Sequence, residues 1–123
     1  MKSSNLLSLV NVAKEAAKNA GKKLFEEFQR PQEVLLSKGR DIKLAVDEIA
    51  EKIIIDYLKE GSKLPILSEE AGITDDLGSE FWVVDPLDGT SNFSRSIPIC
   101  SSSISLIKDG RPNIGVIYDF LNN

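Results

Sequence analysis

Two aspartates that could bind a metal ion stand close together in the second half of the chain. They belong to a run that follows the apolar segment 81–84 and reads Asp85-Pro86-Leu87-Asp88-Gly89-Thr90. We expect a buried strand over 81–84 that ends at Asp85, because Pro86 has no N–H to donate to a neighbouring strand. In the turn that follows, side chains three residues apart can converge, and the Leu87 carbonyl can point to the same place.

The residue types in this run favour a hard cation next to an anion. All the ligands it offers are oxygen atoms, and the chain contains no histidine. Oxygen donors suit Mg²⁺, Mn²⁺ or Ca²⁺ and not zinc. Gly89 permits close approach of a ligand to the backbone, and the N–H groups of residues 89–92 would cradle an anion if they open a helix. The run therefore predicts a phosphate site, although Asp, Pro and Gly are also ordinary turn residues.

Other acidic residues could join this site. Between Glu69 and Asp88 there are seven acidic residues and no Lys or Arg. Such a density of one charge opposes folding unless the acids are solvated or a cation offsets them. Glu69 follows the short apolar segment 64–67, so it is expected at the end of a strand, where a rigid scaffold can hold a site residue.

Composition and charge limit the classes of function. The chain is 41% apolar and 28% charged, which is typical of a soluble globular domain. The net charge is −4 and no cluster of Lys and Arg stands out, so we expect no nucleic-acid partner. No apolar run approaches the length of about 20 residues that spans a membrane. The single cysteine, Cys100, fits a reducing cytoplasm.

The elements that must position these residues follow from hydrophobic spacing. A first helix is expected to end at Pro31, and a second should begin with Asp41 as its N-cap and end near Gly61. The apolar residues predicted to form the buried stripe of the second helix are Ile42, Val46, Ile49, Ile53 and Tyr57. Asp47 then lies at the border of that stripe, either paired with Lys43 at the surface or pointing into a cleft.

The second half of the chain predicts strands. Residues 97–107 alternate between small polar and apolar side chains, and Asp109-Gly110 is a strong hairpin signal before a returning strand over 114–120. We therefore predict an α+β fold in which two long N-terminal helices are layered on a largely antiparallel β-sheet. The whole chain, residues 1–123, is expected to form a single domain.

This combination resembles the inositol monophosphatase family of metal-dependent sugar-phosphate phosphatases. The matching residues are Leu67-Ser68-Glu69-Glu70, the run from Trp82 to Phe93, and Asp47 upstream. The resemblance implies the N-terminal, metal-binding half of a sugar phosphatase-like fold. It also implies a Mg²⁺-dependent phosphomonoesterase that uses metal-activated water to hydrolyse a small phosphorylated polyol such as inositol monophosphate.

The resemblance further implies roles for individual residues. The residues that would hold two or three Mg²⁺ ions offer oxygen donors, namely Glu69, Asp85, the Leu87 carbonyl and Asp88. Those that would bind the phosphate are Gly89, Thr90 and Ser91. Catalytic roles are implied for Asp47, Thr90 and Glu69, with Asp47 and Thr90 orienting and helping to deprotonate the attacking water.

The chain departs from this family in length. Family members are about twice as long, and their second half supplies a further metal-binding aspartate in a Trp-Asp motif, whereas Trp82 here precedes Val83. The missing half is expected from a longer chain or from a partner chain, and association with a second copy is the other arrangement to consider. The final strand should leave an unpaired edge. We expect the isolated chain to bind Mg²⁺ weakly and to have little or no phosphatase activity.

Two alternatives remain open on the sequence alone. The first is a phosphatase of the same family that acts on 3′-phosphoadenosine 5′-phosphate, although that branch more often shows Lys-Glu-Phe where this chain has Ser91-Asn92-Phe93. The second is a non-catalytic association module that uses the same fold and keeps its acidic residues only as a cation site.

Overall fold

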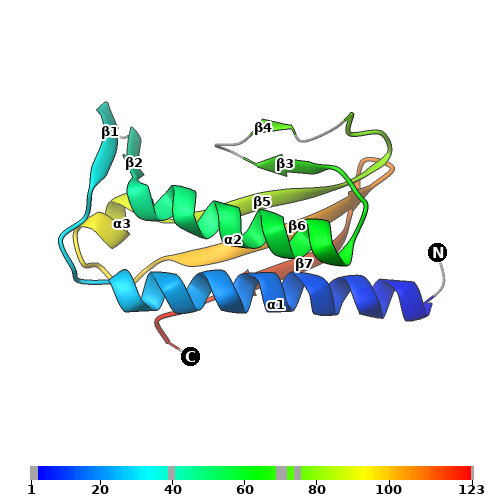
Figure 1. Cartoon of the computed structure of the whole chain (residues 1–123), viewed down its shortest axis with the longest axis horizontal. Helices are drawn as coiled ribbons and strands as arrows, with labels where there is room; N and C mark the ends of the chain where they lie inside the picture. The colour runs from blue at the N-terminus through cyan, green and yellow to red at the C-terminus, as the bar shows by residue number, and fades with distance from the viewer. Residues whose placement is uncertain (1–2, 39–40, 69–71, 74–75, 123) are drawn as a thin grey trace.

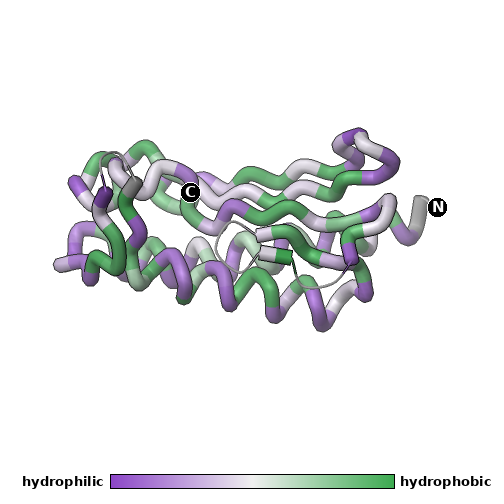
Figure 2. The backbone as a smooth tube through the Cα atoms, turned by 90° about the horizontal axis from the view of Figure 1, so that it is seen from above, coloured by the Kyte–Doolittle hydropathy of each residue, from purple (hydrophilic) through white to green (hydrophobic). Residues whose placement is uncertain are grey.

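Two helices lie on one face of a β-sheet. The computed structural model describes residues 3–38, 41–68, 72–73 and 76–122. Helix α1 (Ser3–Glu27) and helix α2 (Ala45–Gly61) run side by side in opposite directions. The view from above in Figure 2 shows the helices as one layer and the sheet as another. This arrangement confirms the predicted α+β fold.

The sheet has five strands, with β5 in the centre (Figure 1). In spatial order the strands are β4 (Gly72–Ile73), β3 (Ile66–Ser68), β5 (Glu80–Asp88), β6 (Ser101–Lys108) and β7 (Arg111–Tyr118). Only the β3–β5 pair is parallel, so the sheet is largely antiparallel as expected. Asp109 and Gly110 have φ values of 52° and 77°, which make the tight turn of the β6–β7 hairpin.

Helix α1 packs through a stripe of mostly small side chains. Ala13, Ala17, Ala20 and Leu24 are fully or almost fully buried. Small residues allow the helix axis to come close to its neighbours. Gly21 continues this stripe, and a side chain there would collide with the ring of Tyr118 and with Phe120. The C-terminal half of α1 is therefore packed directly against the end of β7 and the residues that follow it.

The prediction that Asp41 caps the second helix is wrong. Strand β1 (Val34–Lys38) pairs with strand β2 (Asp41–Leu44), so residues 41–44 are extended. Helix α2 begins at Ala45, with Leu44 as its N-cap residue. The hairpin consumes backbone N–H and C=O groups that a helix starting at Asp41 would have used, which explains the later start.

The predicted buried stripe of α2 is also partly wrong. Ile49 and Tyr57 are exposed, at 44% and 38% of their surface. The buried side chains are Val46, as predicted, together with Asp47, Ala50, Glu51, Ile54 and Leu58. The buried side is turned by about one residue because α2 contacts both α1 and β5, and Ala50 and Ile54 lie on the side between them.

The strand that carries the two aspartates does not end at Asp85. Strand β5 continues to Asp88, and the short helix α3 (Thr90–Ser94) follows after Gly89. Pro86 is accommodated because the pairing of β5 with β3 is described only as far as Val84, and the pairing with β6 is irregular between Asp85 and Asp88. A proline is tolerated where the ladder is already broken.

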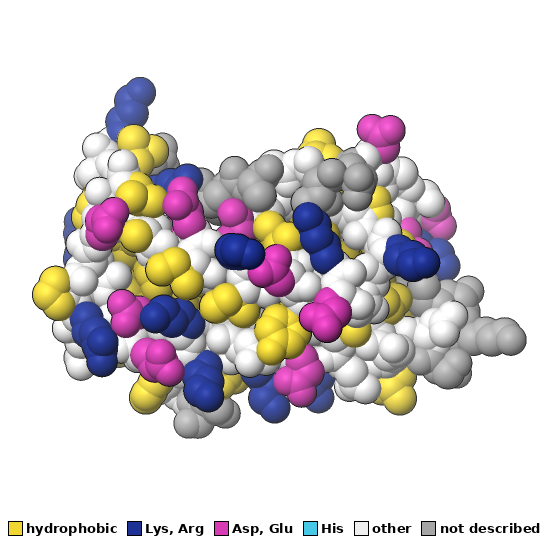
Figure 3. Space-filling view, viewed as in Figure 1, with side chains coloured by type: hydrophobic (Ala, Val, Ile, Leu, Met, Phe, Trp, Pro, Cys, Tyr) yellow, Lys and Arg dark blue, Asp and Glu magenta, His cyan; other side chains and the backbone are white. Residues whose placement is uncertain are grey.

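The helical face of the molecule carries interspersed charges. Figure 3 shows Lys and Arg side chains beside Asp and Glu side chains across this face, with apolar side chains between them. Among the described residues, no helix is long and apolar enough to cross a bilayer.

Candidate metal and phosphate site

A β-bulge places Asp85 and Asp88 on the same side of strand β5. Asp85 is paired with Ser103 and Asp88 with Ser101, so two residues of β5, Pro86 and Leu87, stand opposite the single residue between them on β6. Both Pro86 and Leu87 are buried, whereas Asp85 is half-buried and Asp88 is exposed. In a regular strand, residues three apart point to opposite faces. The bulge removes this obstacle to a joint role for the two carboxylates.

Gly89 connects the bulge to α3 in a backbone conformation that disfavours every other residue type. Its φ of 94° lies in the left-handed region. A Cβ atom at this position would lie 2.7 Å from the Ile99 carbonyl oxygen and 3.1 Å from Cys100 Cβ. The glycine therefore lets the chain turn directly from Asp88 into Thr90 beneath the segment that leads into β6.

Asp47 lies within the buried side of α2 and not at its border, where the sequence placed it. It is 5% exposed and lies in the first turn of α2. Its Oδ2 accepts a hydrogen bond of 2.8 Å from the Leu44 N–H, which fixes the carboxylate against the start of the helix. Lys43, its predicted partner, lies 3.2 Å from Glu48. Asp47 is buried because the buried side of α2 is rotated by about one residue from the predicted one.

The hydroxyl of Thr90 joins Asp47 to the bulge. Its Oγ1 lies 3.3 Å from Asp47 Oδ1 and 3.1 Å from the Leu87 carbonyl oxygen. A hydroxyl carries a single proton, so Thr90 donates fully to one of these acceptors at a time and keeps lone pairs for a further donor. Asp47 and Thr90, which are far apart in the sequence, thus meet beside the strand end that carries Asp85 and Asp88.

A second buried acid on α2, Glu51, was not predicted. It follows Asp47 by one helical turn, is 7% exposed and accepts a hydrogen bond of 2.6 Å from the hydroxyl of Ser68. Ser68 is the last residue of β3, directly before Glu69. The four-residue spacing between the two acids was the available signal, because it places both carboxylates on one side of a helix.

Comparisons with known proteins match almost the whole chain. The sequence profile described as the inositol monophosphatase family matches residues 5–123. The chain belongs to the inositol monophosphatase family. It is 40% identical over 119 residues to Nus factor SuhB of Xylella fastidiosa, and 36% identical over 122 residues to an inositol-1-monophosphatase of Synechocystis. These alignments cover 93% and 94% of this chain.

Solved structures give the same result. The crystal structure of the extragenic suppressor protein suhB from Bartonella henselae superimposes with a TM-score of 0.85 and 36% sequence identity. The superposition covers 91% of this chain but 45% of the Bartonella chain, and the two sequence relatives are covered over 42% of their length. The chain thus spans less than half the length of the inositol monophosphatase relatives that it matches.

The donors on β5 fit the hard metal ions that the resemblance to inositol monophosphatases implies. The bulge brings two carboxylates to one side of the strand, and the Leu87 carbonyl keeps a lone pair after accepting from Thr90. Glu69, the third predicted carboxylate, lies outside the described residues, as does Glu70. Within the described ranges, no three Asp, Glu, Cys or His side chains come together as a metal-binding group.

A groove lies beside Asp88. Its volume is about 590 Å³, and the residues that line it include Asp88, Gly89, Ile117 and Asp119. Cys100 also lines it. Burial raises the pKa of the Cys100 thiol from 9.0 to about 11, and the carboxylates of Asp119 and Asp88 add to the rise. The thiol is therefore protonated at neutral pH and is a poor nucleophile.

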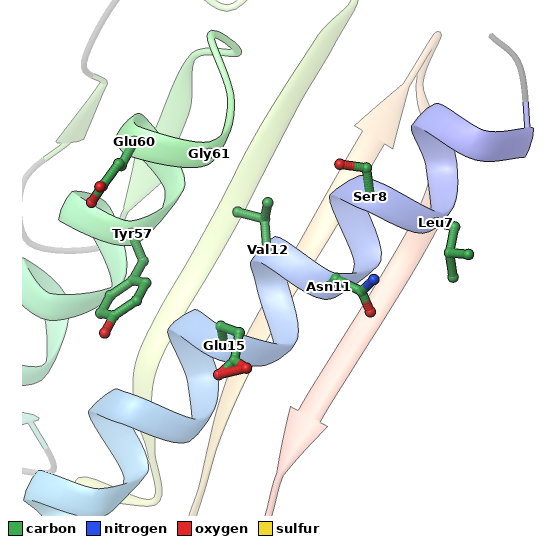
Figure 4. Close-up of a pocket in the computed structure, with 8 residues that line it drawn as sticks. All are labelled: Leu7, Ser8, Asn11, Val12, Glu15, Tyr57, Glu60 and Gly61. Carbon is green, nitrogen blue, oxygen red and sulfur yellow. The ribbon is translucent and has the colours of Figure 1, made fainter.

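A second hollow, of about 610 Å³, lies at the other end of the helices. Figure 4 shows it between the N-terminal half of α1 and the last turns of α2, with Val12 facing Gly61 and Tyr57 close by. The acids that line it are Glu15 and Glu60, one from each helix. None of the residues predicted to act on a phosphate lines this hollow.

Proposed function

We propose that this chain is the metal-binding half of a Mg²⁺-dependent phosphomonoesterase that hydrolyses a small phosphorylated polyol such as inositol monophosphate. The observation that carries the proposal is the β5 bulge, which turns Asp85 and Asp88 to one side next to the Asp47–Thr90 pair. Membership of a family with phosphatase members supports a hydrolase.

The proposed ligands of two or three Mg²⁺ ions are Glu69, Asp85, the Leu87 carbonyl and Asp88. Bound Mg²⁺ would supply the positive charge that makes a water molecule more acidic and neutralises the leaving oxygen. Asp85 and Asp88 would contribute the negative charge that holds such ions. Gly89, Thr90 and Ser91 would hold the phosphate, since Gly89 has no side chain in the way and its neighbours carry hydroxyls.

Asp47 and Thr90 form the proposed proton-accepting pair. Asp47 Oδ2 accepts a hydrogen bond from the Leu44 N–H, and Asp47 Oδ1 faces the Thr90 hydroxyl. When Thr90 donates its proton to Asp47, its own oxygen accepts a hydrogen bond from the attacking water. The proton of the water then moves to Thr90 Oγ1 as the proton of Thr90 moves to Asp47 Oδ1, which leaves the water oxygen free to attack phosphorus.

Complete activity requires a further polypeptide. We place it on the groove beside Asp88, because Ile99 and Ile117 are 71% and 76% exposed there and β7 is an edge strand of the sheet. This polypeptide would correspond to the more than half of each relative that the chain does not cover. It would come from a longer chain or from a partner, with a second copy of this chain as the competing arrangement.

Phosphate release from inositol monophosphate tests the proposal. This chain would be assayed with Mg²⁺, alone and with the separately produced C-terminal part of the Synechocystis inositol-1-monophosphatase. We expect little release from the chain alone and release with the added half. The Asp88→Asn variant should lose that release, as should Thr90→Ala, whereas Thr90→Ser keeps the hydroxyl and should retain most of it. Release that is unaffected by Asp88→Asn contradicts the proposed metal site.

Neither alternative is favoured by the comparisons. An inositol-1-monophosphatase stands among the matched relatives, and Ser91-Asn92 differs from the Lys-Glu expected for an enzyme acting on 3′-phosphoadenosine 5′-phosphate. The Xylella relative is named a Nus factor, which is the reason to keep the association module as an outcome of the assay. No release under any condition, with Mg²⁺ binding retained, would favour that module. A reducing cytoplasm, expected from the single cysteine, stays a prediction.

A further inference from the structure

Ser102 is a polar residue on the apolar face of strand β6. It is fully buried, and the next residues on the same face of the strand are Ile104 and Leu106. A hydroxyl in such surroundings is unfavourable unless it forms a hydrogen bond. The Ser102 hydroxyl donates to the Pro86 carbonyl oxygen at 2.7 Å, and this contact is buried. The serine therefore has a specific partner, and that partner lies inside the bulge of β5.

The position of Ser102 explains why the bulge needs it. Ser102 is the single residue of β6 that stands opposite Pro86 and Leu87. A bulge disrupts the regular ladder of N–H and C=O groups, so carbonyls inside it need other donors. Ser102 supplies one to Pro86 O, and Thr90 can supply another to Leu87 O when its proton is not directed at Asp47. Each carbonyl of the inserted pair is thus within reach of a side-chain hydroxyl.

We propose that Ser102 is a positioning residue that fixes the placement of Asp85 and Asp88 by holding the Pro86 carbonyl. Without this hydrogen bond, the buried Pro86 carbonyl loses its side-chain donor, and the chain relieves the cost by shifting the bulge. Asp85 and Asp88 flank the inserted pair, so any shift moves the two carboxylates relative to each other. The consequence for metal binding rests on the proposed function, whereas the consequence for the backbone does not.

A matched pair of variants separates the hydrogen bond from side-chain volume. Ser102→Thr and Ser102→Val add nearly the same bulk, but only threonine keeps the hydroxyl. Ser105→Val makes the same change on the same strand, on the face opposite to the core. For each variant, the Mg²⁺ affinity of the chain would be measured by titration calorimetry, well below its melting temperature. In the metal-free chain, HN–Hα couplings would report φ at Leu87 and Asp88.

We expect Ser102→Val to weaken Mg²⁺ binding by roughly tenfold. This is the low end of the loss in affinity that follows removal of a residue supporting metal ligands. Its couplings at Leu87 and Asp88 should change, while Ser102→Thr and Ser105→Val should resemble the unchanged chain in both measurements. Couplings that stay the same in Ser102→Val overturn the positioning role, whatever the metal does. An unchanged chain that binds no Mg²⁺ overturns the proposed function and, with it, the link from Ser102 to the metal. Altered couplings with unaltered Mg²⁺ affinity overturn that link alone.

Discussion

The two ends of helix α2 lie in opposite kinds of surroundings. At its N-terminal end, Asp47 is buried and is held by the Leu44 N–H and the Thr90 hydroxyl. At its C-terminal end, the hollow in Figure 4 has about the same volume as the groove beside the candidate site, and its lining is mostly apolar. Volume therefore does not distinguish the two ends. The N-terminal end is distinguished by the buried carboxylate of Asp47, which a protein interior tolerates only when it is hydrogen-bonded.

Each end also depends on a glycine, and the two glycines act differently. Gly89 is required by its positive φ and by the backbone atoms that crowd it. Gly61 only makes room for the side chain of Val12, which lies 2.6 Å from where its Cβ would be. The comparison indicates a rigid polar end with little tolerance and an adaptable apolar end. Four experiments test this contrast between the two ends of α2.

The largest effect is expected from Gly89→Ala. The substitution forces a side chain into the left-handed region and against the Ile99 carbonyl, so it should lower the free energy of unfolding by about 3 kcal/mol. The matched control is Gly110→Ala, which has a φ of 77° but no atom within 4 Å of the added carbon. It should cost about 1 kcal/mol. Equal losses for the two variants in urea unfolding would show that crowding at Gly89 has no energetic role.

The next effect is expected at Asp47. Asp47→Ala removes the acceptor for the Leu44 N–H and should lower the unfolding free energy by about 1–2 kcal/mol. Asp47→Asn keeps an acceptor oxygen and should lose less, which separates the capping role from the proposed proton transfer. Glu60→Ala, an acid at the other end of the same helix, should change stability by less than about 0.5 kcal/mol. A similar loss for Glu60→Ala would erase the contrast between the ends.

A small effect is expected from Gly61→Ala. Alanine favours the helix by about 1 kcal/mol over glycine, but here it collides with the stiff Val12 side chain, so the two terms should nearly cancel. In a Val12→Ala background the collision is absent, and Gly61→Ala should then stabilise the chain. Thermal unfolding of the four proteins in this double-mutant cycle gives the coupling. Independent, additive effects would contradict the proposed contact.

The smallest effect at neutral pH concerns Cys100. Its pKa is about 11 in the folded chain and 9.0 when exposed, so between these values the unfolded chain loses the thiol proton while the folded chain retains it. Stability contributed by this group is complete below pH 9 and falls as the pH rises toward 11. Cys100→Ala should show a shallower decline than the unchanged chain over this window in urea unfolding. If the unfolding free energies of the two proteins declined equally with pH, the folded chain would not shield the Cys100 thiol from solvent.

The sequence allowed prediction of the parts of the fold in which local pattern and packing agree. The alternation along β6 and the Asp109–Gly110 turn were both predicted from the sequence. The start of α2 was not, because Asp41 is a good cap locally but its backbone pairs with β1. Which side of α2 is buried also depends on neighbours that periodicity does not identify.

The candidate site was predictable in its residue types but not in its construction. The Asp85-Pro86 pair indicated the end of a strand, whereas the structure uses Pro86 inside a bulge that keeps both aspartates on one side. A bulge depends on the partner strand, and Ser102 lies too far along the sequence for a local pattern to connect it to Pro86. The joint role of Asp47 and Thr90 came from the family resemblance, since spacing alone left Asp47 either at the surface or pointing into a cleft.

The contact of Gly21 with Tyr118 and Phe120 has a consequence for how the chain folds during synthesis. Helix α1 precedes the other described elements in the sequence, so its side around Gly21 is uncovered until Tyr118 and Phe120 have been made. Contacts between residues far apart in the sequence form slowly, because a long loop has to close. Gly21 therefore reaches these two neighbours only after every strand of the five-stranded sheet has left the ribosome.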